Sequence, residues 1–107
     1  MAIVTVTEAN VKKEIEESTL PVVIDVYASW CGPCQQMAPI FNELEKEMGE
    51  SYKFAKINIE ESRELSIKMG VSKIPTFIFI KNNEVRGKTE GYLPKDDLKA
   101  KIEEFLG

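Results

Sequence analysis

The two cysteines of this chain lie three positions apart, in the segment Trp30-Cys31-Gly32-Pro33-Cys34. The segment follows an apolar stretch, residues 22–27, that is typical of a buried β-strand. On a helix, residues three apart lie on the same face, one turn and about 5 Å along the axis from each other. A disulfide can bridge that separation without strain. The spacing therefore predicts a redox switch, in which two thiols form and break a disulfide while the backbone stays in place.

The length and composition of the chain predict one domain with an ordinary hydrophobic core. It has 107 residues, of which 43% are hydrophobic and 30% are charged, so it can fold without structural disulfides or metals. The net charge of -4 argues against nucleic-acid binding, which needs a basic face. The absence of histidine excludes Cys–His catalysis and histidine-ligated metals. No secretory signal or membrane-spanning stretch is recognisable, so we expect a cytoplasmic protein, in which a cysteine pair is catalytic more often than structural.

Hydrophobic periodicity and turn residues predict alternating strands and helices. Five strands are expected over residues 3–6, 22–27, 53–59, 76–80 and 84–89. Four helices are expected over residues 8–18, 37–48, 63–69 and 96–106, the first of them capped by Thr7. Asn82 and Asn83 separate the last two strands and favour a hairpin turn. The resulting order βαβαβαββα predicts an α/β fold with parallel strands, helices on both faces and an antiparallel edge.

Several motifs along the whole chain are those of one known family. They are Asp25, Trp30-Cys31-Gly32-Pro33-Cys34, Ala38-Pro39, Lys56, Ile74-Pro75-Thr76 and Gly91. With these motifs the chain resembles the thioredoxins. The resemblance implies one thioredoxin domain over residues 1–107, with a central mixed five-stranded sheet flanked by four helices on both faces. It also implies dithiol–disulfide exchange with target proteins, without a cofactor or metal, by an electron carrier that thioredoxin reductase recharges.

The resemblance assigns different roles to the two cysteines. Cys31 would be the attacking thiol, at the N-terminal end of a helix whose free N–H groups and dipole favour a thiolate. We expect the turn at Gly32-Pro33 to expose it. Cys34 would be the resolving thiol, which attacks the mixed disulfide between Cys31 and the target.

Asp25 is the only charged residue in the apolar stretch 22–27. A buried carboxylate is unfavourable unless it is paired or protonated. The resemblance implies that Asp25 exchanges a proton with Cys34 through water, and that Lys56 is its countercharge. From the residues alone, Asp25 could equally bond to the backbone, and Lys56 could be an ordinary solvated lysine.

The resemblance also implies a small apolar face that docks target proteins. Its members would be Trp30, Gly32, Pro33, Ile74, Pro75, Gly91 and Tyr92. Pro75 is expected to be cis and to face the cysteines, although most X–Pro bonds in loops are trans. The backbone of Ile74 could then pair with an extended target segment, as an added strand does.

Four residues depart from the family's pattern, namely Tyr27, Gln35, Lys73 and Asn83. None of them belongs to the redox pair, so they bear on tuning and partner choice. Lys73 is expected to supply, near the Cys31 thiolate, the positive charge that Gln35 lacks.

Three other functions stay open for this chain. A zinc site would need a second chain, because zinc usually takes four ligands and this chain offers two thiols and no imidazole. A disulfide oxidase or isomerase usually has histidine between its cysteines, whereas Gly32-Pro33 favours a reductant. A binding scaffold would keep its function if both cysteines were changed to serine. For the preferred reductase we expect disulfide-containing target proteins as partners, no nucleic acid or membrane, and a monomer.

Overall fold

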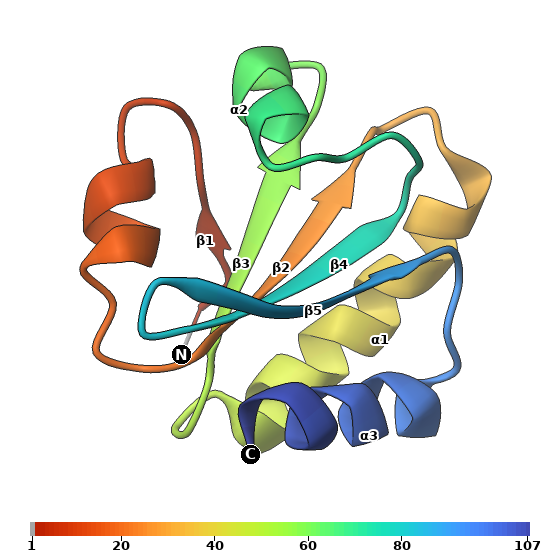
Figure 1. Cartoon of the computed structure of the whole chain (residues 1–107). Helices are drawn as coiled ribbons and strands as arrows, with labels where there is room; N and C mark the ends of the chain where they lie inside the picture. Colours follow the sequence, from red (N-terminus) through yellow and green to blue (C-terminus); the bar gives the residue numbers. More distant parts are fainter. Residues whose placement is uncertain (1) are drawn as a thin grey trace.

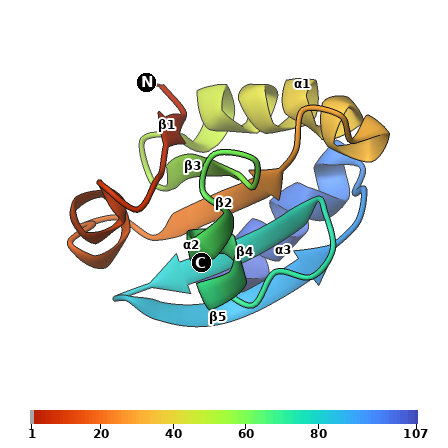
Figure 2. The same ribbon diagram turned by 90° about the horizontal axis from the view of Figure 1, so that it is seen from above.

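The computed structural model describes residues 2–107 and contains a mixed sheet of five strands. The strands are β1 (Val4–Thr5), β2 (Val22–Tyr27), β3 (Lys53–Asn58), β4 (Thr76–Lys81) and β5 (Glu84–Glu90). Their order across the sheet is β1-β3-β2-β4-β5, which can be followed in Figure 2. β1 and β2 are parallel to β3, while β4 is antiparallel to both β2 and β5. The predicted mixed sheet with an antiparallel edge is confirmed.

Helices cover both faces of the sheet. They are η1 (Lys12–Glu16), α1 (Gly32–Met48), α2 (Arg63–Lys68) and α3 (Lys95–Leu106). Figure 1 shows α1 and α3 on one side of the sheet, with η1 and α2 on the other. The core under α1 and α3 is rich in phenylalanine, with Phe41, Phe54, Phe77 and Phe79. The core under η1 and α2 is aliphatic, with Ile15, Ile24, Val26, Leu65 and Ile78. Within residues 2–107, none of the helices is long and apolar enough to span a bilayer.

Strand β2 contributes to both cores because successive side chains of a strand point to opposite faces. Ile24 and Val26 pack in the core under η1 and α2, whereas Val23 packs in the core under α1 and α3. Asp25 has the same parity as Val23 and lines a cavity beside α1. The strand therefore directs its one carboxylate toward the helix that begins at the cysteines.

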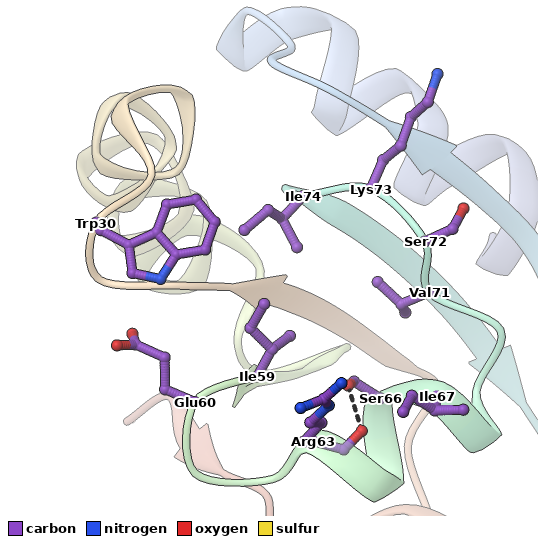
Figure 3. Close-up of a pocket in the computed structure, with 10 residues that line it drawn as sticks. All are labelled: Trp30, Ile59, Glu60, Arg63, Ser66, Ile67, Val71, Ser72, Lys73 and Ile74. Atoms are coloured by element: carbon purple, nitrogen blue, oxygen red, sulfur yellow. Dashed lines mark hydrogen bonds between the residues drawn. The ribbon is translucent and has the colours of Figure 1, made fainter.

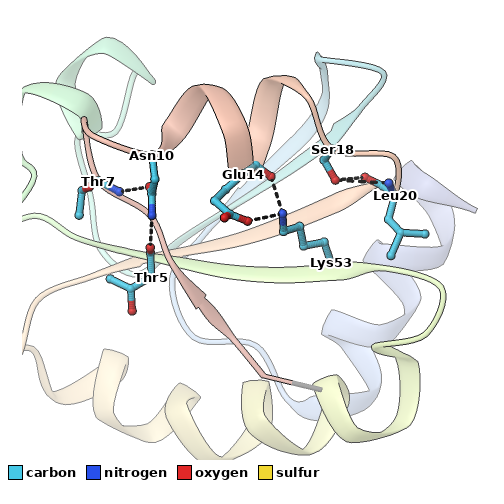
Figure 4. Close-up of polar contacts among 7 residues, drawn as sticks. All are labelled: Thr5, Thr7, Asn10, Glu14, Ser18, Leu20 and Lys53. Carbon is cyan, nitrogen blue, oxygen red and sulfur yellow. Dashed lines mark hydrogen bonds and ion pairs between the residues drawn. The ribbon is translucent and has the colours of Figure 1, made fainter.

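The first helix is shorter than the sequence predicts. η1 is a single π-helical segment over Lys12–Glu16, and Thr7 does not cap it. The Thr7 hydroxyl instead accepts a hydrogen bond from Ala9 N–H in the preceding turn. The Lys53 ammonium donates to the carbonyl and the carboxylate of Glu14 (Figure 4). This contact ties η1 to β3.

The hairpin between β4 and β5 turns at the two asparagines. Asn82 and Asn83 have φ angles of 53° and 59°, in the left-handed region that asparagine tolerates well. The predicted turn is confirmed.

Gly87 on β5 leaves room for the ring of Phe105 on α3. A Cβ at position 87 would lie 2.6 Å from atoms of this ring, which packs in turn against Phe79 with the ring centroids 5.1 Å apart. We expect Gly87→Ala to lower the free energy of unfolding by about 1–3 kcal/mol, because a packed ring must move. Urea denaturation measures the effect. Gly32→Ala is the control, since a Cβ there meets nothing within 4 Å. Equal stabilities for the two variants would contradict this account of the packing.

Candidate functional site

The two cysteines lie at the start of α1, directly after β2. Cys31 is the N-cap, and its sulfur accepts a hydrogen bond from Cys34 N–H at an N···S distance of 3.2 Å. The helix starts at Gly32, earlier than the predicted residue 37, because Pro33 fits a first helical turn although it adds nothing to the apolar periodicity. The two Cα atoms are 5.2 Å apart and the sulfurs form a disulfide. The pairing expected across one helical turn is confirmed.

The expectation that Cys31 is exposed is wrong. Only 6% of its surface is exposed, compared with 4% for Cys34. Tyr27, Ile59 and Ile74 pack against the cysteines and come from three other parts of the chain. Long-range packing therefore covers a sulfur that the local turn at Gly32-Pro33 would have left open.

Asp25 is buried beside Cys34 without a hydrogen-bond partner. Its exposed fraction is 5%, and its Oδ1 atom has no partner among residues 2–107. Asp25 lines a cavity of about 110 Å³ together with Cys34, Asn42 and Lys56. Burial raises the pKa of the Asp25 carboxyl from 3.8 to about 7, and the Lys56 charge only partly opposes this rise. The backbone-bonded alternative for Asp25 has no hydrogen bond to support it within the described residues.

Lys56 lies on the neighbouring strand, opposite Asp25. The two residues are partners in the register between β2 and β3, and both line the same cavity. The Lys56 ammonium also lies over the ring of Tyr27, 5.9 Å from its centroid, which suits a cation–π contact. The resemblance implied that Lys56 lies near Asp25, but the sequence contains no signal for its contact with Tyr27.

The residues of the predicted docking face differ in exposure. Trp30 and Tyr92 are exposed over 69% and 46% of their surfaces, and Gly32 and Pro33 are exposed as well. Ile74 and Gly91 are half-buried, whereas Pro75 is buried. Pro75 follows a cis peptide bond, as expected, and its carbonyl accepts a hydrogen bond from Gly91 N–H at 2.8 Å.

The structure brings this face next to the redox pair. The Ile74 carbonyl oxygen is 4.0 Å from the sulfur of Cys31. Among residues 2–107, no acceptor receives the Ile74 N–H. An apolar surface with an available backbone donor therefore borders the disulfide.

Three polar residues that sequence reasoning did not assign hold the Trp30 loop. The Glu60 carboxylate accepts hydrogen bonds from both the N–H and the hydroxyl of Ser29, each at 2.7 Å. The Gln35 amide donates to the Ser29 carbonyl at 2.8 Å. Gln35 thus has a structural partner at the position where the family commonly carries a cation. The sequence signal was limited to that departure, because residue 60 is far from residue 29 along the chain.

A groove of about 580 Å³ runs from the cysteine end of the molecule to α2 (Figure 3). Its apolar wall is formed by Trp30, Ile59, Ile67, Val71 and Ile74, and charged side chains of Glu60, Arg63 and Lys73 border it. The Lys73 side chain points away from the other lining residues in Figure 3. Its orientation therefore lends no support to the expectation that Lys73 stabilises the Cys31 thiolate.

Comparisons with known proteins agree with one another. The profile of the Thioredoxin family matches residues 2–104. A Thioredoxin of Bacillus subtilis is 39% identical over 106 residues, which span 99% of this chain and 100% of the relative. A Thioredoxin of Rickettsia felis is 40% identical over 93 residues, 87% of this chain and 89% of the relative. A chloroplastic Thioredoxin M-type of Pisum sativum is 42% identical over 89 residues, 83% of this chain and 52% of the relative.

Proposed function

This chain belongs to the thioredoxin family and is a thiol–disulfide oxidoreductase, and on that premise we propose that it is a general protein-disulfide reductase. The observation that carries the proposal is the Cys31–Cys34 pair, which is joined as a disulfide at the start of a helix. The free N–H groups and the dipole of a helix N-terminus favour a thiolate, which is the reactive form of cysteine.

In the proposed reaction the Cys31 thiolate attacks one sulfur of a target disulfide. A mixed disulfide forms and the other target sulfur leaves as a thiolate, which takes up a proton. Cys34 then loses its proton and attacks the Cys31 sulfur. The target leaves with two thiols, and the pair is left as a disulfide. Two electrons pass to the target, and a reductase returns two electrons to the pair.

We assign the proton step to Asp25. Its carboxyl, with a pKa of about 7, can both accept and release a proton at neutral pH. The cavity that it shares with Cys34 has a volume of about 110 Å³, which is enough for several water molecules. The proposed route therefore runs from Cys34 through water to Asp25, and Lys56 lowers the affinity of Asp25 for that proton.

We assign target docking to the apolar face around the disulfide, formed by Trp30, Gly32, Pro33, Ile74, Pro75, Gly91 and Tyr92. The Ile74 N–H and carbonyl would pair with an extended target segment, in the manner of an added strand. The exposed rings of Trp30 and Tyr92 would offer apolar contacts to that segment.

We propose that residues 1–107 act as one domain and as a monomer in the cytoplasm. Thioredoxin reductase would recharge the pair, which would make the chain an electron-transport component in cell redox homeostasis. The partners would be disulfide-containing proteins, and neither nucleic acid nor a membrane would be needed.

Turnover of insulin disulfides, driven by dithiothreitol, tests the proposed function. Reduction separates the insulin chains, and the precipitation of one chain can be followed by turbidity. Fast precipitation at substoichiometric protein would establish a reductase. A folded protein with titratable thiols but no rate above dithiothreitol alone would contradict a general reductase and leave the scaffold as the alternative.

Replacing Lys56 should shift the titration of Asp25. The positive charge of Lys56 favours the ionised carboxylate, so Lys56→Gln should raise the pKa of Asp25 further above its value of about 7. The ¹³C shift of the Asp25 carboxyl, followed by NMR over a pH series, measures this directly. Lys101→Gln, on α3, is the control because its partner is Glu104 on the same helix. An unchanged Asp25 titration in Lys56→Gln would remove Lys56 from the proton step.

A further inference from the structure

The groove beside the disulfide extends well past the apolar face around the cysteines. Trp30 and Ile74 line its cysteine end, and Arg63 and Ile67 line it where α2 forms its wall (Figure 3). Ile67 is exposed over 60% of its surface. A target segment that passes Trp30 therefore meets a further apolar wall on α2.

The three charged side chains that line this groove differ in their contacts and orientation. The Glu60 carboxylate already accepts two hydrogen bonds from Ser29, which lower its pKa. Lys73 points away from the other lining residues. The Arg63 guanidinium, by contrast, has no ion-pair partner within residues 2–107. Glu60 stays negatively charged, and Arg63 is the lining cation that does not point away from the groove, so its guanidinium can bind a carboxylate there.

We propose that Arg63 selects target segments that carry a carboxylate, while the apolar wall holds an apolar side chain close to the reacting cysteine. The inference rests on the proposed function and names its substrate class: extended acidic–apolar segments next to a disulfide. A planar guanidinium can bind a carboxylate through two parallel hydrogen bonds, which gives direction as well as attraction.

The exposure of Arg63 determines how strongly it should favour acidic target segments. Its side chain is exposed to solvent, and exposed ion pairs contribute little free energy because water and salt screen them. We therefore expect a preference of about threefold to fivefold in the rate constant for attack on the target. The preference should fade as the salt concentration rises.

A set of short peptides tests this directly. Each peptide carries one cysteine, joined by a disulfide to neutral 2-thiopyridine, beside a leucine. A single residue, either glutamate or lysine, is moved through the five positions on each side of the cysteine. Attack by the reduced protein on the peptide sulfur forms the mixed disulfide and releases 2-thiopyridone, whose absorbance gives the second-order rate constant.

The chain contains two arginines, and the second supplies a matched control. Arg86 is exposed on β5, pairs with Glu84 and does not line the groove. Arg86→Gln removes the same charge from the molecule as Arg63→Gln. We expect the wild-type protein and Arg86→Gln to prefer glutamate over lysine at one or two adjacent positions. Arg63→Gln should abolish the preference, and Arg63→Glu should reverse it.

The outcomes separate this inference from the function on which it rests. Equal rates for glutamate and lysine peptides at every position, or a preference that survives in Arg63→Gln, would overturn the role of Arg63 and leave the reductase intact. If no peptide reacts faster than with dithiothreitol at equal thiolate concentration, the proposed reductase fails together with the inference.

Discussion

Cys31→Ser should lower the rate of insulin reduction by at least about a thousandfold, to the rate of dithiothreitol alone. A serine hydroxyl does not ionise at neutral pH, so it cannot replace the attacking thiolate. We do not expect Cys34 to take over, because it lines the inner cavity with Asp25, whereas Cys31 lies next to Ile74 of the apolar face. Circular dichroism of Cys31→Ser should match that of the reduced wild-type protein, which shows that the loss is chemical.

Cys34→Ser should still react with the target but should fail to release it, in contrast to Cys31→Ser, which should not react. Cys31 can still attack, but nothing within the molecule resolves the mixed disulfide, so a covalent complex with the target accumulates. In the wild-type protein the resolving sulfur is close by, with Cα atoms 5.2 Å apart, and an intramolecular attack is very fast. Non-reducing electrophoresis and intact mass should show a one-to-one adduct that dithiothreitol releases. Full activity in either variant would exclude the assigned division of roles.

Asp25→Asn should make the protein more stable at pH 8, by about 4 kcal/mol. The carboxyl pKa is 3.8 in an unfolded chain and about 7 in the folded one. Between these values the folded protein keeps a proton that the unfolded chain has lost. The wild-type free energy of unfolding therefore falls, by about 1.4 kcal/mol per pH unit, as the pH rises through this window. Asparagine has no such ionisation, so its advantage should be largest above pH 7 and should shrink toward pH 4.

The same substitution should slow catalysis while it stabilises the fold. Without the carboxylate, Cys34 loses its nearby proton acceptor, and reduction at pH 7 should be at least about tenfold slower. Urea denaturation and insulin turnover, both measured from pH 5 to 9, test the two effects together. Glu45→Gln, at another buried carboxyl that lies on α1 outside the cavity beside Cys34, is the control for stability. A rate that stays at the wild-type value across this range would remove Asp25 from the mechanism.

The regular elements were predictable because their causes are local. Each of these elements is determined by residues that lie within a few positions of one another. Examples are the apolar run of β2, the asparagine turn before β5 and the helical periodicity of α1. The cysteine pair is equally local, since one helical turn sets its geometry. The positions of Asp25 and Lys56 on neighbouring strands followed from the predicted parallel sheet, with help from the family resemblance.

The parts that were missed depend on residues far apart in the chain. η1 is held to β3 by the contact between Lys53 and Glu14, which lie 39 positions apart. Cys31 is covered by Ile59 and Ile74, and the sequence around position 31 does not predict these contacts. The groove next to the disulfide likewise exists only once α2 and the segment before Pro75 are folded side by side. Local periodicity contains no information about such long-range contacts.

Strand β5 lies at an open edge of the sheet, so its side chains affect whether copies of this protein associate with one another. An unpaired edge invites a second copy to add its own strand, which is the first step toward aggregation. Along β5 the exposed positions include Glu84, Arg86, Lys88 and Glu90, and charges of this kind make edge-to-edge pairing unfavourable. The opposite edge is β1, which has only two residues. Both edges of the sheet are therefore poor templates for a second copy, although Val85 on β5 is exposed over 62% of its surface.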